Sequence, residues 1–278
     1  MTNHVSGKSI IVTGAGGGFG KLVSEKAAAL GARITCADIN EDAVRAVVAG
    51  ITQAGGSAQA VRADVTRIDD MRALAARAVE AHGAIDVMVN NAGTMPLSFI
   101  GDHQRALDAW NRCIDINFKG VMNGSVAVYD QMMAQGRGHI INLSSIYGNA
   151  PVVGAAVYGA TKAAVNTFSE SLRVETRGKI KVTIVKPTGV PMTGLAGGIV
   201  NPEATIGILA QNAGAFGEMM EQVGAGTFPA ERLDPENIDY AMLAPDHIAD
   251  AIIYAIDQPW GVSIGDITIR AAGDHFVL

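Results

Sequence analysis

Three polar residues stand at spacings that suit acid–base chemistry on one oxygen atom. Tyr158 and Lys162 are four residues apart, and Ser145 lies thirteen residues before the tyrosine. On a helix, a spacing of four places both side chains on one face, about 5–6 Å apart at Cβ. Because an ammonium stabilises phenolate, we expect the pKa of Tyr158 to fall from its ordinary value of about 10. With a serine hydroxyl to hold a developing alkoxide, the three residues predict interconversion of an alcohol and a carbonyl.

Such a reaction needs a redox cofactor, and a glycine-rich segment predicts where it binds. Residues Ile10–Val12 predict a strand, Thr13–Gly20 a glycine-rich loop and Lys21–Leu30 an amphipathic helix. Glycine lets the backbone approach a pyrophosphate closely, and the helix N-terminus offers free N–H groups with positive dipole character. The residues expected to contact a dinucleotide here are Gly14, Gly16, Gly18, Phe19 and Gly20.

An acidic residue after the second expected strand bears on the choice of cofactor. Asp38 follows the strand Arg33–Ala37 and stands eighteen residues after Gly20. A carboxylate at about this distance accepts a hydrogen bond from the ribose 2′-hydroxyl. It would repel a 2′-phosphate, and no Lys or Arg stands beside Asp38 and Ile39 or in the glycine loop. NAD is therefore favoured over NADP, with contacts expected from both residues.

Two further motifs make a resemblance specific enough to name. Asn90–Gly93 reads Asn-Asn-Ala-Gly after the apolar run Ile85–Val89, and the glycine loop has the pattern Thr-Gly-x-x-x-Gly-x-Gly. With Asn117 and the Ser145, Tyr158 and Lys162 set, the chain resembles the short-chain dehydrogenase/reductase family. The resemblance runs from about Gly7 to Pro187 and resumes near the C-terminus.

The resemblance implies roles for particular residues. In the family, Asn117, Ser145, Tyr158 and Lys162 would form a catalytic tetrad, in which the lysine also holds the nicotinamide ribose and the asparagine organises a water chain. Singly, Asn117 has an ordinary use as a helix cap and Ser145 as a turn residue. The other cofactor contacts that the resemblance implies are Asp64, Val65, Asn91, Ala92, Gly93, Pro187, Gly189 and Val190.

One stretch departs from the family pattern. The family usually has Pro-Gly-x-Val after its sixth strand, whereas Thr188 stands here in place of the glycine. The following threonine, Thr193, comes one position late, after the additional Pro191. A cofactor role for Thr193 is therefore doubtful. A family variant without functional meaning explains the departure equally well.

The substrate end is expected in a long segment after the sixth strand. Residues 188–243 form a loop or lid, in which Ile206–Gln222 predicts a helix. Its Met and Phe residues suggest an apolar, adaptable wall, and no basic cluster is present to bind a phosphate or a coenzyme A tail. A small, neutral and fairly apolar alcohol or ketone is the expected substrate. The residues expected to contact it are Met95, Ser145, Tyr147, Tyr158 and Met192.

Strands and helices alternate along the chain. This alternation predicts an α/β fold with a doubly wound, Rossmann-type parallel sheet and helices on both faces, as a single domain over residues 1–278. The remaining expected strands are Ala58–Arg62, His139–Leu143 and Lys179–Val185, and the remaining helices Glu41–Ala54, Ile68–His82, Gln104–Asn111, Phe118–Gln135 and Ala156–Thr176.

Composition excludes several classes of function. The chain has 278 residues, 49% of them hydrophobic, and a formal charge of −6, which argues against a nucleic-acid surface. Met1–Lys8 lacks the apolar core of a secretion signal, and no run is long enough to span a membrane. Cys36 and Cys113 have no metal-ligand or paired spacing, so buried thiols in a cytoplasmic protein without metal are expected.

Two other functions stay open from the sequence. An NADP-dependent reductase acting on a β-ketoacyl group would share the tetrad, although Asp38 weighs against it. A regulator that binds the nucleotide without catalysis is opposed by the intact tetrad. The family resemblance also implies a homotetramer built on the helices Phe118–Gln135 and Ala156–Thr176. The apolar chain end, His275–Leu278, suggests docking against a neighbouring subunit.

Overall fold

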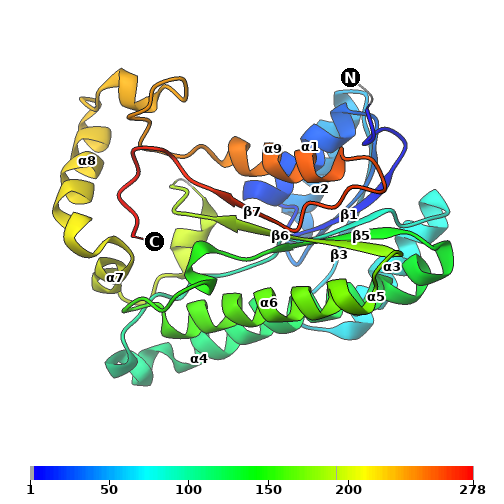
Figure 1. Cartoon of the computed structure of the whole chain (residues 1–278), viewed down its shortest axis with the longest axis horizontal. Coiled ribbons are helices and arrows are strands. Elements are labelled where there is room, and N and C mark those ends of the chain that lie inside the picture. The colour runs from blue at the N-terminus through cyan, green and yellow to red at the C-terminus, as the bar shows by residue number, and fades with distance from the viewer. Residues whose placement is uncertain (1–2, 192, 278) are drawn as a thin grey trace.

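A single parallel sheet forms the centre of the molecule in the computed structural model, which describes residues 3–191 and 193–277 (Figure 1). Within these residues the strands are β1 (Ser9–Thr13), β2 (Arg33–Asp38), β3 (Ser57–Arg62), β4 (Val87–Asn90), β5 (Gly138–Leu143), β6 (Ile180–Pro187) and β7 (Asp266–Ile269). Their order is β3-β2-β1-β4-β5-β6-β7, and all neighbouring pairs are parallel. The predicted doubly wound α/β fold is confirmed.

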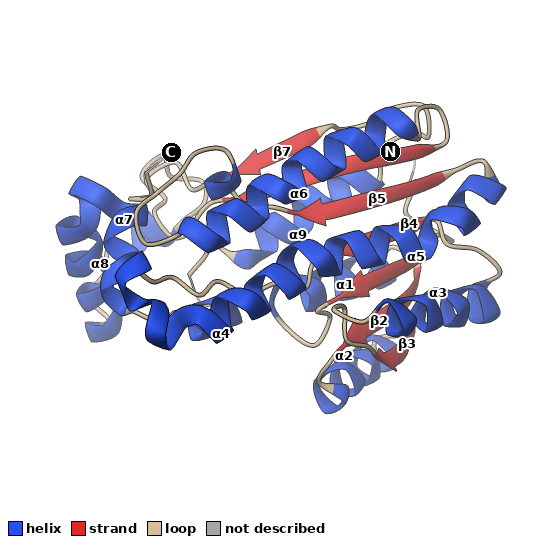
Figure 2. Cartoon of the chain, turned by 90° about the horizontal axis from the view of Figure 1, so that it is seen from below, coloured by secondary structure: helices blue, strands red, loops and turns tan. Residues whose placement is uncertain are grey.

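Helices cover both faces of this sheet (Figures 1 and 2). They are α1 (Gly18–Ala29), α2 (Glu41–Gln53), α3 (Ile68–His82), α4 (His103–Ile114), α5 (Gly120–Gln135), α6 (Ala156–Glu175), α7 (Ile206–Leu209), α8 (Ala213–Ala225) and α9 (Pro245–Ile256). On one face lie α1, α2 and α9, and on the other α3, α5 and α6, with α4 beside α6. In the described part of the chain, no helix has the length and apolar character needed to cross a membrane.

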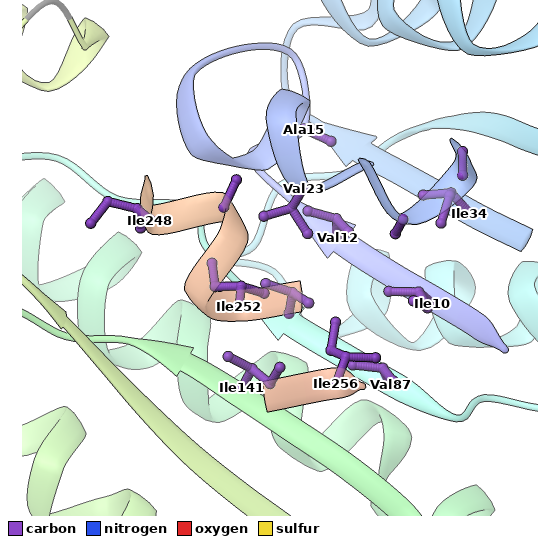
Figure 3. Packing of buried hydrophobic residues seen from close by; sticks show 14 of the residues in the cluster. Ile10, Val12, Ala15, Val23, Ile34, Val87, Ile141, Ile248, Ile252 and Ile256 are labelled. Atoms are coloured by element: carbon purple, nitrogen blue, oxygen red, sulfur yellow. The ribbon is translucent and has the colours of Figure 1, made fainter. Parts of the chain in front are cut away.

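Both faces of the sheet are buried, which explains why its strands read as continuous apolar runs. Successive residues of β1 point to opposite sides. Ile10 and Val12 pack with the helices α1, α2 and α9 (Figure 3). Ile11 packs with α3 and α5 on the other side. All three side chains are fully buried. The two apolar layers hold the sheet in place between the helices. They thereby fix the position of the sheet edge at which the loops emerge.

Helix α9 was not predicted, and the expected helix after β6 has a different shape in the structure. α9 begins at Pro245 and places Ile248, Ile252 and Ile256 against the layer of α1 (Figure 3). The expected helix Ile206–Gln222 is broken between α7 and α8, where Ala210 has a φ of 46°. A non-glycine residue in this region cannot continue a right-handed helix.

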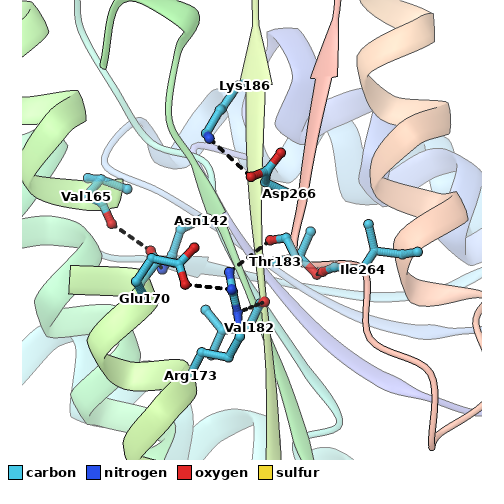
Figure 4. A network of polar contacts seen from close by, with 11 residues as sticks. Asn142, Val165, Glu170, Arg173, Val182, Thr183, Lys186, Ile264 and Asp266 are labelled. Carbon is cyan, nitrogen blue, oxygen red and sulfur yellow. Dashed lines mark hydrogen bonds and ion pairs between the residues drawn. The ribbon is translucent and has the colours of Figure 1, made fainter. Parts of the chain in front are cut away.

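The edge strand β7, also not predicted, is held to β6 by polar side chains (Figure 4). Lys186 Nζ lies 3.3 Å from Asp266 Oδ2, and Thr183 Oγ1 donates to the Ile264 carbonyl at 2.7 Å. Arg173 of α6 donates to the Gly265 carbonyl just before the strand at 3.1 Å. These contacts hold β7 beside β6. The chain therefore returns to the edge of the sheet where the candidate site lies.

The packing of α5 on β4 gives a test of the fold. A Cβ atom at Gly124 would lie 2.0 Å from Asn90 Oδ1 and 2.8 Å from Met88 Cε, whereas one at Gly50 of α2 would meet no described atom within 4 Å. We expect Gly124→Ala to lower the free energy of unfolding by about 1–3 kcal/mol, since α5 must move away from the sheet. Gly50→Ala is the matched control and should raise it by up to about 1 kcal/mol. Urea unfolding measures both, and equal effects would contradict the packing described.

Candidate active site

A cavity of about 610 Å³ lies beyond the carboxyl ends of the central strands. Its wall combines the segments that follow β1, β4, β5 and β6 with α6 and the lid. Ligands bind at this edge in open parallel sheets. The sequence-predicted residues that line it are Gly14, Gly18, Phe19, Asp38, Asn91, Ala92, Gly93, Met95, Ser145, Tyr147, Tyr158, Lys162, Pro187, Gly189 and Val190. One cavity is therefore lined by predicted residues that range from the first 20 positions of the chain to the loop after β6.

Helix α6 brings Tyr158 and Lys162 together one turn apart. Their side chains are almost fully buried, at 5% and 6% exposure. Lys162 Nζ lies 5.8 Å from the centroid of the Tyr158 ring and donates to the Leu143 carbonyl at 2.8 Å. That bond fixes the ammonium at the end of β5. Ser145 follows the same strand and is 4% exposed, so all three groups meet at one wall of the cavity.

Burial dominates the ionisation of the tyrosine and the lysine. It raises the pKa of Tyr158 to about 12, although a hydrogen bond with Ser145 acts in the opposite direction. Burial also lowers the pKa of Lys162 to about 8. The sequence analysis expected a lowered tyrosine pKa, and this expectation is wrong for the protein's own groups. The cost of removing the phenolate from water exceeds the stabilisation that the Ser145 hydrogen bond gives it.

Asn117 lies behind the cavity wall and clamps a backbone segment. It sits in a short π-helical stretch, Asp115–Lys119, and is completely buried. Its Oδ1 accepts from the Thr94 N–H and its Nδ2 donates to the Thr94 carbonyl, both at 2.8 Å. Nδ2 also approaches Cys113 Sγ and Thr161 Oγ1 at 3.3 Å. Asn117 therefore holds the segment that follows β4, through Thr94, and contacts α6 through Thr161. These contacts suit a positioning role.

The glycine loop has the shape that a pyrophosphate requires. Gly17 is the N-cap of α1, no described side chain caps it, and a Cβ atom there would meet no described atom within 4 Å. Gly17, Gly18 and Phe19 at this helix end line the cavity. Gly20 serves packing instead, because its Cβ would lie 2.3 Å from the Gly14 carbonyl oxygen. Asn91 Nδ2 braces the loop by donating to Gly14 O at 3.2 Å. These residues fit a dinucleotide.

Asp38 lies against the glycine loop at the end of β2. Its Oδ2 accepts from the Gly16 N–H and its Oδ1 from the Asn40 N–H, both at 2.9 Å. The carboxylate is thus fixed where it lines the cavity. A fixed carboxylate suits a ribose hydroxyl donor and disfavours a second anion.

Several residues expected at the cofactor do not line the cavity. Gly16 and Gly20 pack within the loop, and Ile39 is 59% exposed. Asp64 Oδ1 accepts from the N–H and hydroxyl of Thr66, at 2.9 and 2.8 Å, in the turn before α3. Val65 packs against the position of Gly120. Met192 lies outside the described residues.

Some of the residues that line the cavity were not identified from the sequence as site residues. Leu143, which anchors Lys162, and Phe276, near the end of the chain, both belong to its wall. The Phe276 ring packs inside its own chain, against Gly189 and Phe216, whereas docking of the chain end against a neighbouring subunit stays a prediction. The only sequence signal for Phe276 was the apolar character of the terminus. The lid contributes the apolar residues Leu195, Ile199, Ile208, Leu209, Phe216 and Met220.

Comparisons with known proteins agree with this geometry. A family model described as short chain dehydrogenase matches residues 8–204. An uncharacterized oxidoreductase of Listeria monocytogenes is 33% identical over 268 residues, covering 95% of this chain and 96% of the relative.

Solved structures are similar over almost the whole chain. A metagenomic short-chain oxidoreductase in complex with NADP has 27% identity and a TM-score of 0.72, covering 96% of this chain and 98% of that one. A short-chain dehydrogenase/reductase from Burkholderia phymatum in complex with NAD has 26% identity and a TM-score of 0.75, covering 96% and 90%.

The lowered pKa of Lys162 predicts a pH-dependent stability. Between pH 8 and pH 10.5 the unfolded chain holds a proton on Lys162 that the folded chain has lost, so stability rises with pH in that window. Relative to Lys162→Met, the wild type should gain up to about 3 kcal/mol of unfolding free energy across it. Urea unfolding at pH 7.5 and 10 measures the gain. Lys21→Met, which removes a lysine with a 48% exposed side chain, is the control, and the same trend in both variants would contradict this account.

Proposed function

Because the chain belongs to the short-chain dehydrogenase family of oxidoreductases, we propose that it interconverts a secondary alcohol and a ketone with NAD as cofactor. The observation that carries the proposal is that one cavity is lined by Ser145, Tyr158 and Lys162 together with the glycine loop and Asp38. The acid–base groups and the dinucleotide-binding groups therefore line a single cavity.

In the proposed mechanism, each polar residue acts on the substrate oxygen or on the proton that it exchanges. The nicotinamide supplies hydride transfer when it is bound. During reduction Tyr158 donates its phenolic proton to the carbonyl oxygen, and during oxidation it removes the alcohol proton. Ser145 stabilises the charge that develops on that oxygen. Since the pKa of Tyr158 is raised to about 12, the phenol is protonated at neutral pH and is ready to act as the acid.

Lys162 and Asn117 support this proton transfer from behind. The ammonium is held by the Leu143 carbonyl and stabilises the phenolate that forms when Tyr158 gives up its proton. Asn117 holds the Thr94 backbone on both its N–H and its carbonyl. We assign Asn117 a positioning role in the tetrad that the family resemblance implies.

An apolar lid favours a neutral substrate. Phe216, Met220 and Ile208 line the cavity together with Met95 and Tyr147. Apolar pockets with a few convergent polar groups bind small organic ligands, and here the polar groups converge at Tyr158. Residues 188–243 act as the substrate lid in this proposal. A small, fairly apolar secondary alcohol or ketone suits the wall.

A second candidate is an NADP-dependent ketone or ketoacyl reductase. It is favoured by the metagenomic relative, which binds NADP, while the Burkholderia phymatum protein binds NAD. Asp38, fixed at the loop by Gly16 and Asn40, weighs against a 2′-phosphate. A regulator without catalysis is disfavoured because Ser145, Tyr158 and Lys162 all line the cavity in which the nucleotide would bind.

We place the enzyme in the cytoplasm as a homotetramer. The apolar residues Leu107, Ile114 and Val126 on α4 and α5 are 55%, 45% and 50% exposed, and Val174 at the end of α6 is 62% exposed. Exposed apolar residues on α4 and α5, which follow one another along the chain, and on α6, which packs beside α4, are suited to contacts between subunits. The formal charge of −6 is consistent with small-molecule chemistry rather than nucleic-acid binding.

Removing the phenolic hydroxyl tests the proposed acid–base residue. We expect Tyr158→Phe to lower kcat by at least about 100-fold, because general acid–base catalysis contributes roughly 10²–10⁴. NAD affinity, measured by fluorescence titration, should stay near the wild-type value. Tyr254→Phe removes a hydroxyl from a 56% exposed tyrosine and serves as the control. Full turnover by Tyr158→Phe on a panel of ketones would refute the assignment.

Removing the charge of Asp38 tests the choice of cofactor. The wild type should bind NAD at least about tenfold more tightly than NADP, a difference of about 1.4 kcal/mol. In Asp38→Asn this preference should shrink at least about tenfold, since the repulsion of a 2′-phosphate is lost. Asp42→Asn, an exposed neighbour on α2, is the control. A wild-type preference for NADP would overturn the assignment to NAD.

A further inference from the structure

The last part of the chain folds back into the substrate end of the molecule. Residues Gly273–Val277, here called the C-terminal clasp, lie between the sheet and the lid helices α7 and α8 (Figure 1). The clasp begins where the Gly273 N–H donates to the Tyr240 carbonyl at 2.8 Å. It passes the end of β6 and reaches the lid, so it contacts both sides of the cavity.

A buried carboxylate fixes the clasp to the loop after β6. The side chain of Asp274 is only 1% exposed. Its Oδ1 accepts from Arg270 Nη2 at 2.6 Å and from the Phe276 N–H at 3.2 Å, and its Oδ2 accepts from Thr188 Oγ1 at 3.2 Å. A buried charge with several donors is a strong local anchor, and losing one donor is costly. Thr188 is the residue that stands where the family pattern has glycine, and a glycine has no hydroxyl for this bond.

The other end of the clasp is bonded to the lid. The Val277 N–H donates to the Ile208 carbonyl of α7 at 3.0 Å, and Asn212 Nδ2 donates to the His275 carbonyl at 3.0 Å. Arg270 Nη2 donates to the Phe276 carbonyl at 2.9 Å. The backbone on both sides of Phe276 is therefore held, and its ring has little freedom to turn away.

The held ring forms part of the cavity wall. Phe276 lines the same cavity as Ser145 and Tyr158. It lies directly over Gly189, where a Cβ atom would come within 1.9 Å of the Phe276 Cζ atom. On its other side it meets the lid, since the Phe276 and Phe216 rings are 5.6 Å apart at their centroids and inclined at 61°. The ring thus takes up space inside the cavity between the loop after β6 and the lid helix α8.

We infer that Phe276 determines substrate specificity by closing the substrate end of the cavity, and that Thr188 and Asp274 position it. The inference rests on the proposed function. The ring limits the length of the apolar group attached to the reacting carbon. The hydrogen bond from Thr188 to Asp274 gives a physical reason for a threonine where the family pattern has glycine.

A series of straight-chain ketones from 2-butanone to 2-decanone tests the role of the ring. For each ketone, kcat/KM is compared between the wild type and Phe276→Ala, and binding is measured separately by displacement of the apolar dye Nile red. Phe276→Ala should shift the preference toward long ketones over short ones by at least about tenfold, because one methylene in an apolar pocket changes selectivity by about 10–200-fold. Phe168→Ala, which removes a half-buried ring on the α5 side of α6, should keep the wild-type profile of chain length.

The anchor is tested with two variants of Thr188. Thr188→Val keeps the shape but loses the hydroxyl that donates to Asp274, so it should shift the preference in the same direction as Phe276→Ala, by a smaller factor. Thr188→Ser keeps the hydroxyl and should keep the wild-type dependence of kcat/KM on chain length. A general loss of stability would lower all rates without changing the profile, so these ratios separate positioning from folding.

The outcomes distinguish this inference from the proposed function. If no ketone or alcohol is turned over by the wild type, yet Phe276→Ala shifts the dye displacement toward longer ketones, the proposed reaction is wrong and the role of the ring stands. If the wild type turns over ketones and Phe276→Ala has the same chain-length profile, the inference is overturned. Absence of ketone binding in both proteins also overturns it.

Discussion

The account depends on the burial of an ammonium beside a phenol at one edge of the sheet. Lys162 and Tyr158 are held one helical turn apart and are almost completely removed from water. Burial disfavours both charged forms. It therefore raises the pKa of Tyr158 and lowers the pKa of Lys162 from their ordinary values. In the proposed reaction, a carbonyl oxygen bound beside such a pair would meet a protonated acid with a cation close behind it. The fold maintains this arrangement against its cost by anchoring the lysine to the Leu143 carbonyl.

The strands place the other groups at that same edge. Because the sheet is parallel and both of its faces are covered, the turns after β1, β2, β4, β5 and β6 emerge on one side. The glycine loop, Asp38 and Ser145 are far apart in the chain and meet there. The buried pair therefore faces a cavity that also has the features of a dinucleotide site.

Local patterns made most of the fold and the centre of the site predictable. The helix Ile68–His82 was predicted with the bounds that it has, because its apolar spacing and the glycine after it are local signals. The adjacency of Tyr158 and Lys162 followed from a spacing of four. By contrast, α9, β7 and the break at Ala210 depend on contacts with distant elements. The direction of the Tyr158 pKa depends on burial, which no local pattern states.

Contacts across long sequence separations shape the substrate end. Phe276 reaches Gly189 from the far end of the chain, and Asp274 reaches Thr188 in the same way. No local periodicity in the sequence predicts such pairs, so the wall formed by the lid and Phe276 was the least predictable part of the site. The sequence marked Thr188 as unusual, and its partner became visible only in three dimensions.

The most direct test of the account is a crystal structure of the protein with NAD and a secondary alcohol bound. The account predicts that Tyr158 Oη and Ser145 Oγ both lie about 2.6–3.2 Å from the alcohol oxygen. An alcohol oxygen bound away from both hydroxyls, with the dinucleotide in the cavity, would contradict it.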